Sequence, residues 1–210
     1  MSYGWAGDVV RLVPLDKERH LENCLRWLND PDLTQAILGG DFPISARAEN
    51  AWFDKMTSEI GGTDIVFAIE TPAGEHVGLA GIHHIDYRHG TGYTGTIIGD
   101  SRDRNQGLGS DAVRIRTRYA FETLGLRLLT SEVMAGNLPS MRVLEKSGYR
   151  QCGVIPKRYW KRGEFRDAHQ FACLREWWQG ARTGSSDSAV RELSNLSDDG
   201  RAFSPPPALR

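Results

Sequence analysis

The segment Arg104–Gly109 (RNQGLG) has the composition of a phosphate-binding loop that opens a helix. The first backbone N–H groups of a helix lack partners within it, and together with the helix dipole they attract phosphate oxygens. Gly107 and Gly109 have no side chains, so a pyrophosphate can approach the backbone closely. A glycine-rich helix start that serves only tight packing explains this segment alone equally well. The predicted loop comprises Arg104, which could add a charged contact, and Asn105, Gln106, Gly107, Leu108, Gly109 and Ser110.

Two common nucleotide motifs do not fit this loop. A Walker loop needs a lysine before its Ser or Thr, and Gly109 is followed directly by Ser110. A dinucleotide fingerprint needs three glycines straight after the first strand of a βαβ unit, whereas this loop follows the fourth predicted strand. The loop therefore predicts phosphate binding of another kind.

A second segment with binding potential begins at Asn137. The predicted strand Leu128–Val133 is followed by Asn137 and by a short helix that ends near Gly148. If this strand lies beside Tyr93–Gly99, both following helices start at the same end of the sheet, where ligands of open α/β sheets bind. A long ligand could place its phosphates on the first helix start and extend an arm toward the second.

The helices and strands that must position these segments follow from the spacing of apolar residues. Helices are predicted over 17–29, after Ser45, after Gly107 and over Asn137–Lys146. The helix after Gly107 has one buried face, formed by Leu108, Ala112, Ile115 and Tyr119. Strands are predicted at Val9–Pro14, Ile65–Glu70, Val77–Ile85, Tyr93–Gly99, Leu128–Val133, Tyr149–Ile155 and Ala168–Leu174. This order predicts an α/β fold with a mixed sheet of about seven strands flanked by four helices.

The composition predicts one domain, over 1–179, followed by a tail. Residues 180–210 are rich in Ser, Gly, Asp and Pro, and such a segment cannot bury enough apolar surface to offset its chain entropy. The 26 Lys and Arg residues nearly balance the 27 Asp and Glu residues, so nucleic acid and membranes are not expected as partners.

Targeting and metal motifs are missing from the sequence. The N-terminus has no basic segment followed by an apolar run, and no apolar stretch is long enough to cross a bilayer, so we expect a cytoplasmic protein. The three cysteines, Cys24, Cys152 and Cys173, have the spacing of neither a metal site nor a redox pair. No metal is expected.

The phosphate loop and the second segment together resemble the GCN5-related N-acetyltransferase (GNAT) superfamily. The branch most resembled contains the ribosomal-protein-alanine and spermidine acetyltransferases. The family's acetyl-CoA loop, Gln/Arg-x-x-Gly-x-Gly/Ala, is matched by Arg104, Gly107 and Gly109. Its distal signature is matched by Asn137, Ser140 and Gly148-Tyr149, and features typical of the branch occur at Trp27–Pro31 and at Trp160, Gly163 and Asp167. The similarity covers roughly Val9 to Trp178.

The resemblance implies a mostly antiparallel sheet that splays at a slot for acetyl-CoA. Backbone groups of Ile97, Ile98 and Gly99 would contact the pantetheine arm, the loop over 104–110 would hold the pyrophosphate, and Asn137 and Ser140 would lie near the thioester. The implied reaction is direct attack by a neutral amine in a ternary complex, with acetyl-CoA as co-substrate and no acyl-enzyme. Positioning two reactants in this way supplies much of the rate.

Two positions depart from the family pattern. Many members carry a Tyr in the distal helix that protonates the leaving thiolate, and the aligned residue here is Leu144. In the ribosomal branch a Ser aligned with Ser140 and a downstream Glu are proposed to act, but the Glu position aligns with Tyr159. A complete known acid–base pair is therefore absent.

Three residues are candidates for proton transfer, namely Ser140, Glu132 and Tyr159. An amine is mostly protonated at neutral pH, so a base such as Glu132 must accept a proton before attack. Tyr159 and Tyr93 could donate a proton to the thiolate, although core or rim packing explains both as well. An ordinary sheet residue or helix-start residue is the competing explanation for each of them.

Four residues are candidates for the acceptor pocket: Trp27, His83, Tyr93 and Trp160. Aromatic faces suit a cationic amine, although core packing explains Trp27 as well. His83 and His84 should point to opposite faces of their strand, so at most one faces the slot. A locally basic hairpin (Lys157, Arg158, Lys161, Arg162 and Arg166) is usually a solvated face, and it disfavours a polyamine acceptor.

These observations predict an N-acetyltransferase that acts on a primary amine, either a small molecule or a protein N-terminus. Transfer of a longer acyl chain is a second possibility among enzymes. A CoA-binding sensor that has lost catalysis is the alternative from another class, and RNA or ribosome docking through the basic hairpin is a third. The sequence is compatible with a monomer or a homodimer.

Overall fold

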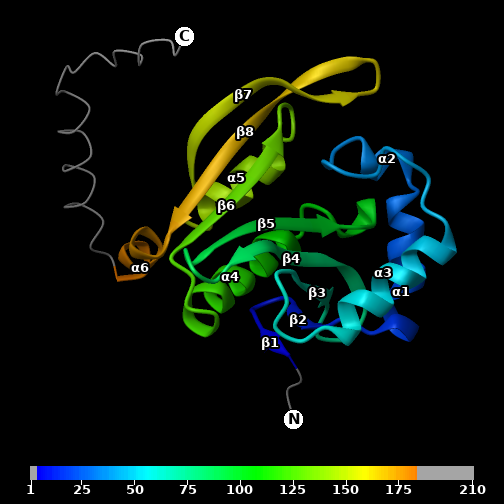
Figure 1. The fold of residues 1–210 in the computed structure, drawn as a ribbon, viewed down its shortest axis with the longest axis horizontal. Coiled ribbons are helices and arrows are strands. Elements are labelled where there is room, and N and C mark those ends of the chain that lie inside the picture. Colours follow the sequence, from blue (N-terminus) through cyan, green and yellow to red (C-terminus); the bar gives the residue numbers. More distant parts are fainter. Residues whose placement is uncertain (1–3, 184–210) are drawn as a thin grey trace, which may run out of the picture. The chain divides into compact units, whose positions relative to one another are not determined.

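The computed structural model describes residues 4–183 (Figure 1). Contacts divide the chain after Trp178, so that the first unit comprises Met1–Trp178. The predicted tail over 180–210 lies outside the described residues, apart from the end of the helix Arg175–Thr183 (α6). The division into a domain and a tail therefore stays a prediction.

One eight-stranded sheet forms the centre of the first unit, in the order β1-β2-β3-β4-β5-β6-β8-β7. Only β5 and β6 pair in parallel, and all other neighbours are antiparallel. The mixed, mostly antiparallel sheet is thus confirmed. The strands are β1 (Trp5–Ala6), β2 (Arg11–Pro14), β3 (Ile65–Glu70), β4 (His76–Asp86), β5 (Thr91–Ile98), β6 (Leu128–Met134), β7 (Arg150–Lys161) and β8 (Glu164–Leu174). The additional strand is β1, which has two residues and is too short to show a periodicity.

The four predicted helices are present, and the described residues contain two more α-helices, a 3-10 turn at Ser101–Asp103 and a π-helical turn at Tyr119–Thr123. The predicted helices are α1 (Lys17–Leu28), α3 (Ala46–Ser58), α4 (Leu108–Arg118) and α5 (Leu138–Lys146). The added ones are α6 and α2 (Pro31–Thr34), a single turn that starts at the Asp30 N-cap where the sequence predicted only a helix end. α6 continues past Trp178, whose ring packs 5.4 Å from Phe121 in the core.

The core lies between one face of the sheet and the helices α4 and α5, which cover that face. The predicted face of α4 is buried as expected, because Leu108, Ala112 and Ile115 join the cluster formed by residues of β2, β3 and β4. Leu144 of α5 joins a second cluster that includes Phe171 of β8. α1 and α3 pack together, and α1 contacts β4.

The sheet splays between β5 and β6. Their parallel pairing ends at Tyr93 and Thr130, although both strands continue. In Figure 1, β6, β8 and β7 turn away from β5 beyond this point. Hydroxyl groups bridge the start of the gap, since Thr94 Oγ1 donates to Thr130 O at 3.1 Å and Ser131 Oγ donates to Thr94 O at 2.9 Å. The expected splayed slot is therefore present.

The β7–β8 hairpin is longer than predicted and is tied to the segment after α2. Lys161 is buried, with 4% of its surface exposed. Its Nζ donates to Thr34 O at 3.2 Å, Gly39 O at 2.9 Å and Asp41 Oδ1 at 2.6 Å. The expectation of a solvated basic face fails at Lys161, because three oxygen acceptors replace water around the ammonium group.

Candidate active site

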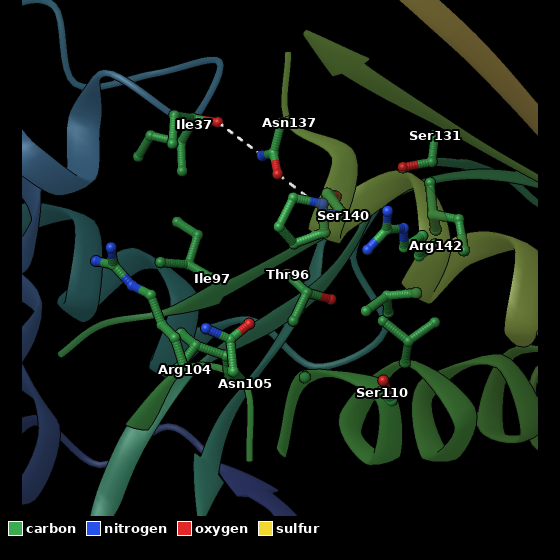
Figure 2. Close-up of a pocket in the computed structure, with 18 of the residues that line it drawn as sticks. Ile37, Thr96, Ile97, Arg104, Asn105, Ser110, Ser131, Asn137, Ser140 and Arg142 are labelled. Carbon is green, nitrogen blue, oxygen red and sulfur yellow. Dashed lines mark hydrogen bonds between the residues drawn. The ribbon is translucent and has the colours of Figure 1, made fainter. Parts of the chain in front are cut away.

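A cavity of about 610 Å³ fills the gap where β5 and β6 separate. Its walls are the end of β5, the starts of α4 and α5, and the segment after α2 that includes Ala36 and Ile37. Figure 2 shows Thr96 and Ile97 between the loop residue Arg104 and Asn137, the N-cap of α5. The two segments singled out in the sequence thus meet across one cleft.

The start of α4 has the properties of an anion-binding site. Gly107 is the N-cap at φ +83°, and no side chain caps the helix. The first hydrogen bond to the cap runs from Asp111 N to Gly107 O at 3.0 Å, so the N–H groups of the preceding first turn are left for a ligand. The backbone turns through a second left-handed residue at Asn105, with φ +62°. Such alternation aims successive N–H groups at one point.

Positive side chains dominate the cleft. Arg104, Arg116, Arg142 and Lys146 line it, and Asp103 is the acidic residue among the lining side chains. Arg104 Nη2 is held by Gly99 O at 2.8 Å. This charge balance favours an anionic ligand such as a pyrophosphate.

Most of the predicted CoA-binding residues line the cleft, but three do not. The residues that line it are Ile97, Ile98, Arg104, Asn105, Gly107, Gly109, Ser110, Asn137 and Ser140. Leu108 points into the core, with 8% of its surface exposed, because it belongs to the apolar face of α4. Gln106 is exposed and its Nε2 donates to Arg102 O at 2.6 Å. Gly99 lies against the Trp27 ring, where any side chain would collide.

Asn137 joins two walls of the cleft. Its Oδ1 accepts a hydrogen bond from Ser140 N at 3.2 Å and so caps α5. Its Nδ2 donates to Ala36 O at 3.0 Å. Because Asn137 provides the cap, the Ser140 hydroxyl is not needed for that role and lies at the cleft wall (Figure 2).

The other two predicted catalytic residues contact each other. The Tyr159 hydroxyl donates to Glu132 Oε2, which also accepts from Arg158 Nε at 3.0 Å. Gln170 Nε2 donates to Glu132 Oε1 at 3.3 Å. Burial, together with the bond to Glu132, raises the pKa of Tyr159, so its phenol stays protonated at neutral pH.

Glu132 and Ser131 are successive residues of β6, so their side chains point to opposite faces of the sheet. Ser131 lines the cleft, which places the Glu132 cluster on the other face of the splayed strand. Tyr93 pairs with Thr130, two residues before Glu132, and burial together with the nearby charge of Glu132 raises the pKa of Tyr93 to about 12. The splay therefore has a cationic cleft on one face and a carboxylate with two tyrosines on the other.

The remaining acceptor candidates lie outside the cleft. Trp27 is 2% exposed and packs 4.7 Å from the His76 ring, as a core residue does. His83 Nδ1 lies 3.0 Å from Asp64 Oδ1. Trp160 is 58% exposed and stacks edge-on against Phe165 at the tip of the hairpin.

Sequence reasoning missed two cleft features. Arg116 of α4 lines the cleft while buried, and its spacing of four from the buried Ala112 was the available signal. Leu33 of α2, together with Ala36 and Ile37 of the segment after it, forms a cleft wall. No sequence pattern marked it, because its position depends on the distant Asn137 and Lys161.

The cysteines stand apart from the cleft. Burial raises the pKa of both Cys24 and Cys173 to about 12, so these thiols are not nucleophiles at neutral pH. Cys152 is exposed on β7. Within residues 4–183 no cluster of His, Cys, Asp or Glu is arranged to hold a metal ion. In the same part of the chain no helix has the length and apolar character needed to span a membrane.

Comparison with known proteins identifies a family signature over most of the chain. Residues 10–150 match the profile of the acetyltransferase (GNAT) domain. The chain is similar to the protein of Bacillus subtilis (strain 168) named "Probable N-acetyltransferase YjcK", with 37% identity over 75 residues. That match covers 36% of this chain and 41% of YjcK, so it spans less than half the length of that relative.

Two solved structures share the fold at low sequence identity. A spermidine N-acetyltransferase from Vibrio cholerae, in complex with CoA and spermine, superposes with a TM-score of 0.74 at 17% identity, covering 81% of this chain and 98% of that one. The microcin C7 self-immunity acetyltransferase MccE, in complex with acetyl-CoA and AMP, gives a TM-score of 0.68 at 14% identity over 80% of this chain and 93% of its own.

Proposed function

The chain belongs to the GNAT acetyltransferase family, and we propose that it transfers an acetyl group from acetyl-CoA to a primary amine by direct attack in a ternary complex. The observation that carries this proposal is the splay of β5 and β6 over a cationic cleft, with an uncapped helix start at one end and a carboxylate on the opposite face. Each part has a separate role in the reaction.

The residues of the cleft fit CoA. The uncapped first turn of α4 and the guanidinium of Arg104 would hold the pyrophosphate. A Cβ at Gly109 would lie 3.4 Å from the Ile98 side chain, so the bare backbone leaves room beside β5. Ile97 and Ile98 lie beyond the part of β5 that pairs with β6, and they would offer backbone groups to the pantetheine arm on that side.

The gap would bring the two substrates together from opposite faces. The thioester would reach it along the Ser131 face and the amine from the Glu132 face. The amine nitrogen attacks the thioester carbonyl carbon, and Glu132 takes the proton that the nitrogen loses, directly or through a water. The C–S bond then breaks, and the thiolate takes a proton from a neighbouring donor. Ser140 at the cleft wall and the phenol of Tyr159 are the candidates for that donor.

The acceptor would be a small amine or a protein N-terminal amine. The sequence argument against a polyamine rested on the positive charge of the hairpin. Much of that charge is balanced locally, because Arg158 pairs with Glu132 at 3.0 Å and Lys161 with Asp41 at 2.6 Å. The two tyrosines beside Glu132 would suit a cationic group. A polyamine acceptor therefore belongs in the screen.

One observation favours the second candidate, a CoA-binding sensor without turnover. Leu144 lines the cleft at the position where many family members carry a proton-donating Tyr, and it is 4% exposed. A sensor and an enzyme would both bind CoA. Only the enzyme releases free thiol when an amine is added.

The test is a thiol-release assay with acetyl-CoA and a panel of amines that includes amino sugars, polyamines and peptides with free N-termini. Amine-dependent release of one thiol per amide formed is the expected result. Binding of acetyl-CoA without release for any amine would contradict the transferase and support the sensor.

A further inference from the structure

Arg116 is a buried cation on the wall of the cleft. It lies on α4, is 1% exposed, and is one of the residues that line the cavity. Among the described residues no carboxylate lies within 4 Å of its guanidinium, whereas the neighbouring Arg114 pairs with Asp111. Buried charges in proteins are normally paired, because removal from water is costly. An anion that is not part of the chain would complete this site.

Within the described residues, the hydrogen bonds of the Arg116 guanidinium are made by Nη1. Nη1 donates to Gly95 O at 2.7 Å and to Thr96 Oγ1 at 2.6 Å. Nε is buried and has no partner in the described part of the chain. The edge that carries Nε and Nη2 is the fork that binds a carboxylate through two parallel hydrogen bonds.

A purely structural role does not explain a charged residue at this position. Nη1 alone donates to Gly95 O and Thr96 Oγ1, and a neutral donor at this position could supply those bonds. The adjoining wall is apolar, with Val113 at 2% and Leu144 at 4% exposure. A guanidinium that lies beside apolar residues, with its Nε unpartnered in the described part of the chain, therefore points to a ligand.

The position of Arg116 separates it from the phosphate end of the cleft. It lies seven residues after Gly109, which is about 10 Å along the helix axis. Its hydrogen-bond partners Gly95 and Thr96 lie where β5 leaves β6. Phosphates held at the helix start would place the acyl end of a CoA thioester, and not its nucleotide, near Arg116.

We propose that this protein also uses CoA thioesters whose acyl group ends in a carboxylate, such as succinyl-CoA, and that Arg116 binds this carboxylate. The inference rests on the proposed function and names a second class of donor for the same cleft. Val113 and Leu144 would contact the methylene groups. The amine attacks the thioester carbon, the C–S bond breaks, and one proton passes from nitrogen to the leaving sulfur. The product is an amide that keeps its free carboxylate.

The test compares succinyl-CoA with butyryl-CoA, which has the same chain length and a methyl group in place of the carboxylate. Both are measured for thermal stabilisation without acceptor and for thiol release with an amine that acetyl-CoA acylates. A charge-assisted, two-bond contact predicts a kcat/KM about tenfold higher for succinyl-CoA, and tighter binding. Equal use of the two thioesters, or preference for butyryl-CoA, would overturn the inference.

Variants then assign the preference to Arg116. Arg116→Met should invert the ratio of succinyl-CoA to butyryl-CoA use, and Arg116→Lys, which keeps the charge without the fork, should reduce it. The ratio is unaffected by a general loss of active protein. Arg118→Met, on the exposed side of α4, is the matched control and should keep the wild-type ratio. An Arg116→Met protein with the wild-type ratio would overturn the assignment.

Binding of unmodified CoA separates this inference from the proposed function. If CoA stabilises the protein but succinyl-CoA is used no better than butyryl-CoA, the inference about Arg116 fails and the proposed function stands. If CoA does not bind, the proposed function fails and the second donor class fails with it.

Discussion

Gly107 meets two demands at the start of α4. Its φ of +83° is a conformation that side-chain-bearing residues rarely adopt, and no atom lies within 4 Å of the position that a Cβ would occupy. The conformation turns the chain into the helix, and the open space leaves room for a ligand. The backbone therefore demands glycine here, and the proposed pyrophosphate would be a second reason for it.

Gly107→Glu should abolish CoA binding, because it places a negative side chain where the pyrophosphate would lie. Gly125→Glu is the matched control, since Gly125 has φ +71°, similarly open surroundings and a position outside the cleft. Calorimetry with CoA should show binding to the control and not to Gly107→Glu. Equal affinities would contradict the phosphate loop.

Three hydrogen-bond donors hold the Glu132 carboxylate in one orientation. A fixed orientation is what the proposed role as general base requires. Glu132→Gln should lower kcat by about a hundredfold, the usual contribution of a general base, with little change in CoA affinity. Tyr159→Phe should lower kcat less, because it removes one of the donors. Steady-state kinetics with calorimetry checks both. An unchanged kcat for Glu132→Gln would make the cluster structural.

Asn137 provides the side-chain cap of α5, so the Ser140 hydroxyl is not needed for that structural role. Ser140→Ala should lower kcat while CoA affinity and the free energy of unfolding stay close to wild type. Asn137→Ala is the comparison, because it removes both the cap and the bond to Ala36 O and should cost about 1 kcal/mol or more of stability. A Ser140→Ala enzyme with wild-type turnover would leave the hydroxyl without a chemical role.

At the scale of elements, the amphipathic helices and the β-branched strands followed from the sequence, because each is specified by local spacing. β1 and α2 did not, since two and four residues are too short to show a period. The register of the β5–β6 splay and the position of the segment after α2 depend on partners far along the chain. Asn137 and Lys161 fix that segment from 101 and 122 residues away.

The same division holds within the site. The glycines of the loop were predictable because their backbone role has a local signature. The contact between Glu132 and Tyr159 joins residues that were named separately, and only the antiparallel β6–β8–β7 arrangement brings them together. Arg116 was missed because a charged residue on a predicted helix is normally assigned to the exposed face.

Lys161 links the hairpin to a wall of the cleft, and its removal should loosen that wall. Lys161→Met leaves the carbonyls of Thr34 and Gly39 without their donor and should lower the free energy of unfolding by about 1–3 kcal/mol. Lys157→Met, at an exposed position of the same strand, should change it little. Urea denaturation of the two variants checks this. Equal free energies of unfolding for the two variants would show that the hydrogen bonds of Lys161 do not stabilise the protein.

The packing of α1 against β4 predicts a dependence of stability on pH. Burial, and then the neighbouring His20, lowers the pKa of His76 to about 4. The unfolded chain therefore binds a proton near pH 6.5 that the folded protein refuses until about pH 4, and stability falls as the pH decreases through this window. Between pH 7.5 and 5 the loss from His76 should be about 2 kcal/mol.

The variant His76→Gln should lose about 2 kcal/mol less of its free energy of unfolding between pH 7.5 and 5 than the wild type. The variant His89→Gln, at an exposed position, should lose as much as the wild type. Denaturation at the two pH values measures the difference. A His76→Gln protein that loses as much stability as wild type would show that His76 titrates normally in the folded state.

At the scale of the whole molecule, the proposed function assigns one task to each face of the splayed sheet. The face with α4 and α5 offers backbone N–H groups and cations to a long anionic ligand. In the proposed reaction, the opposite face would present Glu132 and its tyrosines to an amine. The gap between β5 and β6 is where the two would meet, so the arrangement favours transfer between bound substrates without a covalent enzyme intermediate.

Thermal unfolding with acetyl-CoA, followed by thiol release on addition of amines in the same samples, tests this arrangement as a whole. We expect acetyl-CoA to raise the unfolding temperature and at least one amine to release thiol in step with amide formation. If acetyl-CoA leaves the unfolding temperature unchanged, the start of α4 is not a CoA site and the proposed transfer is contradicted.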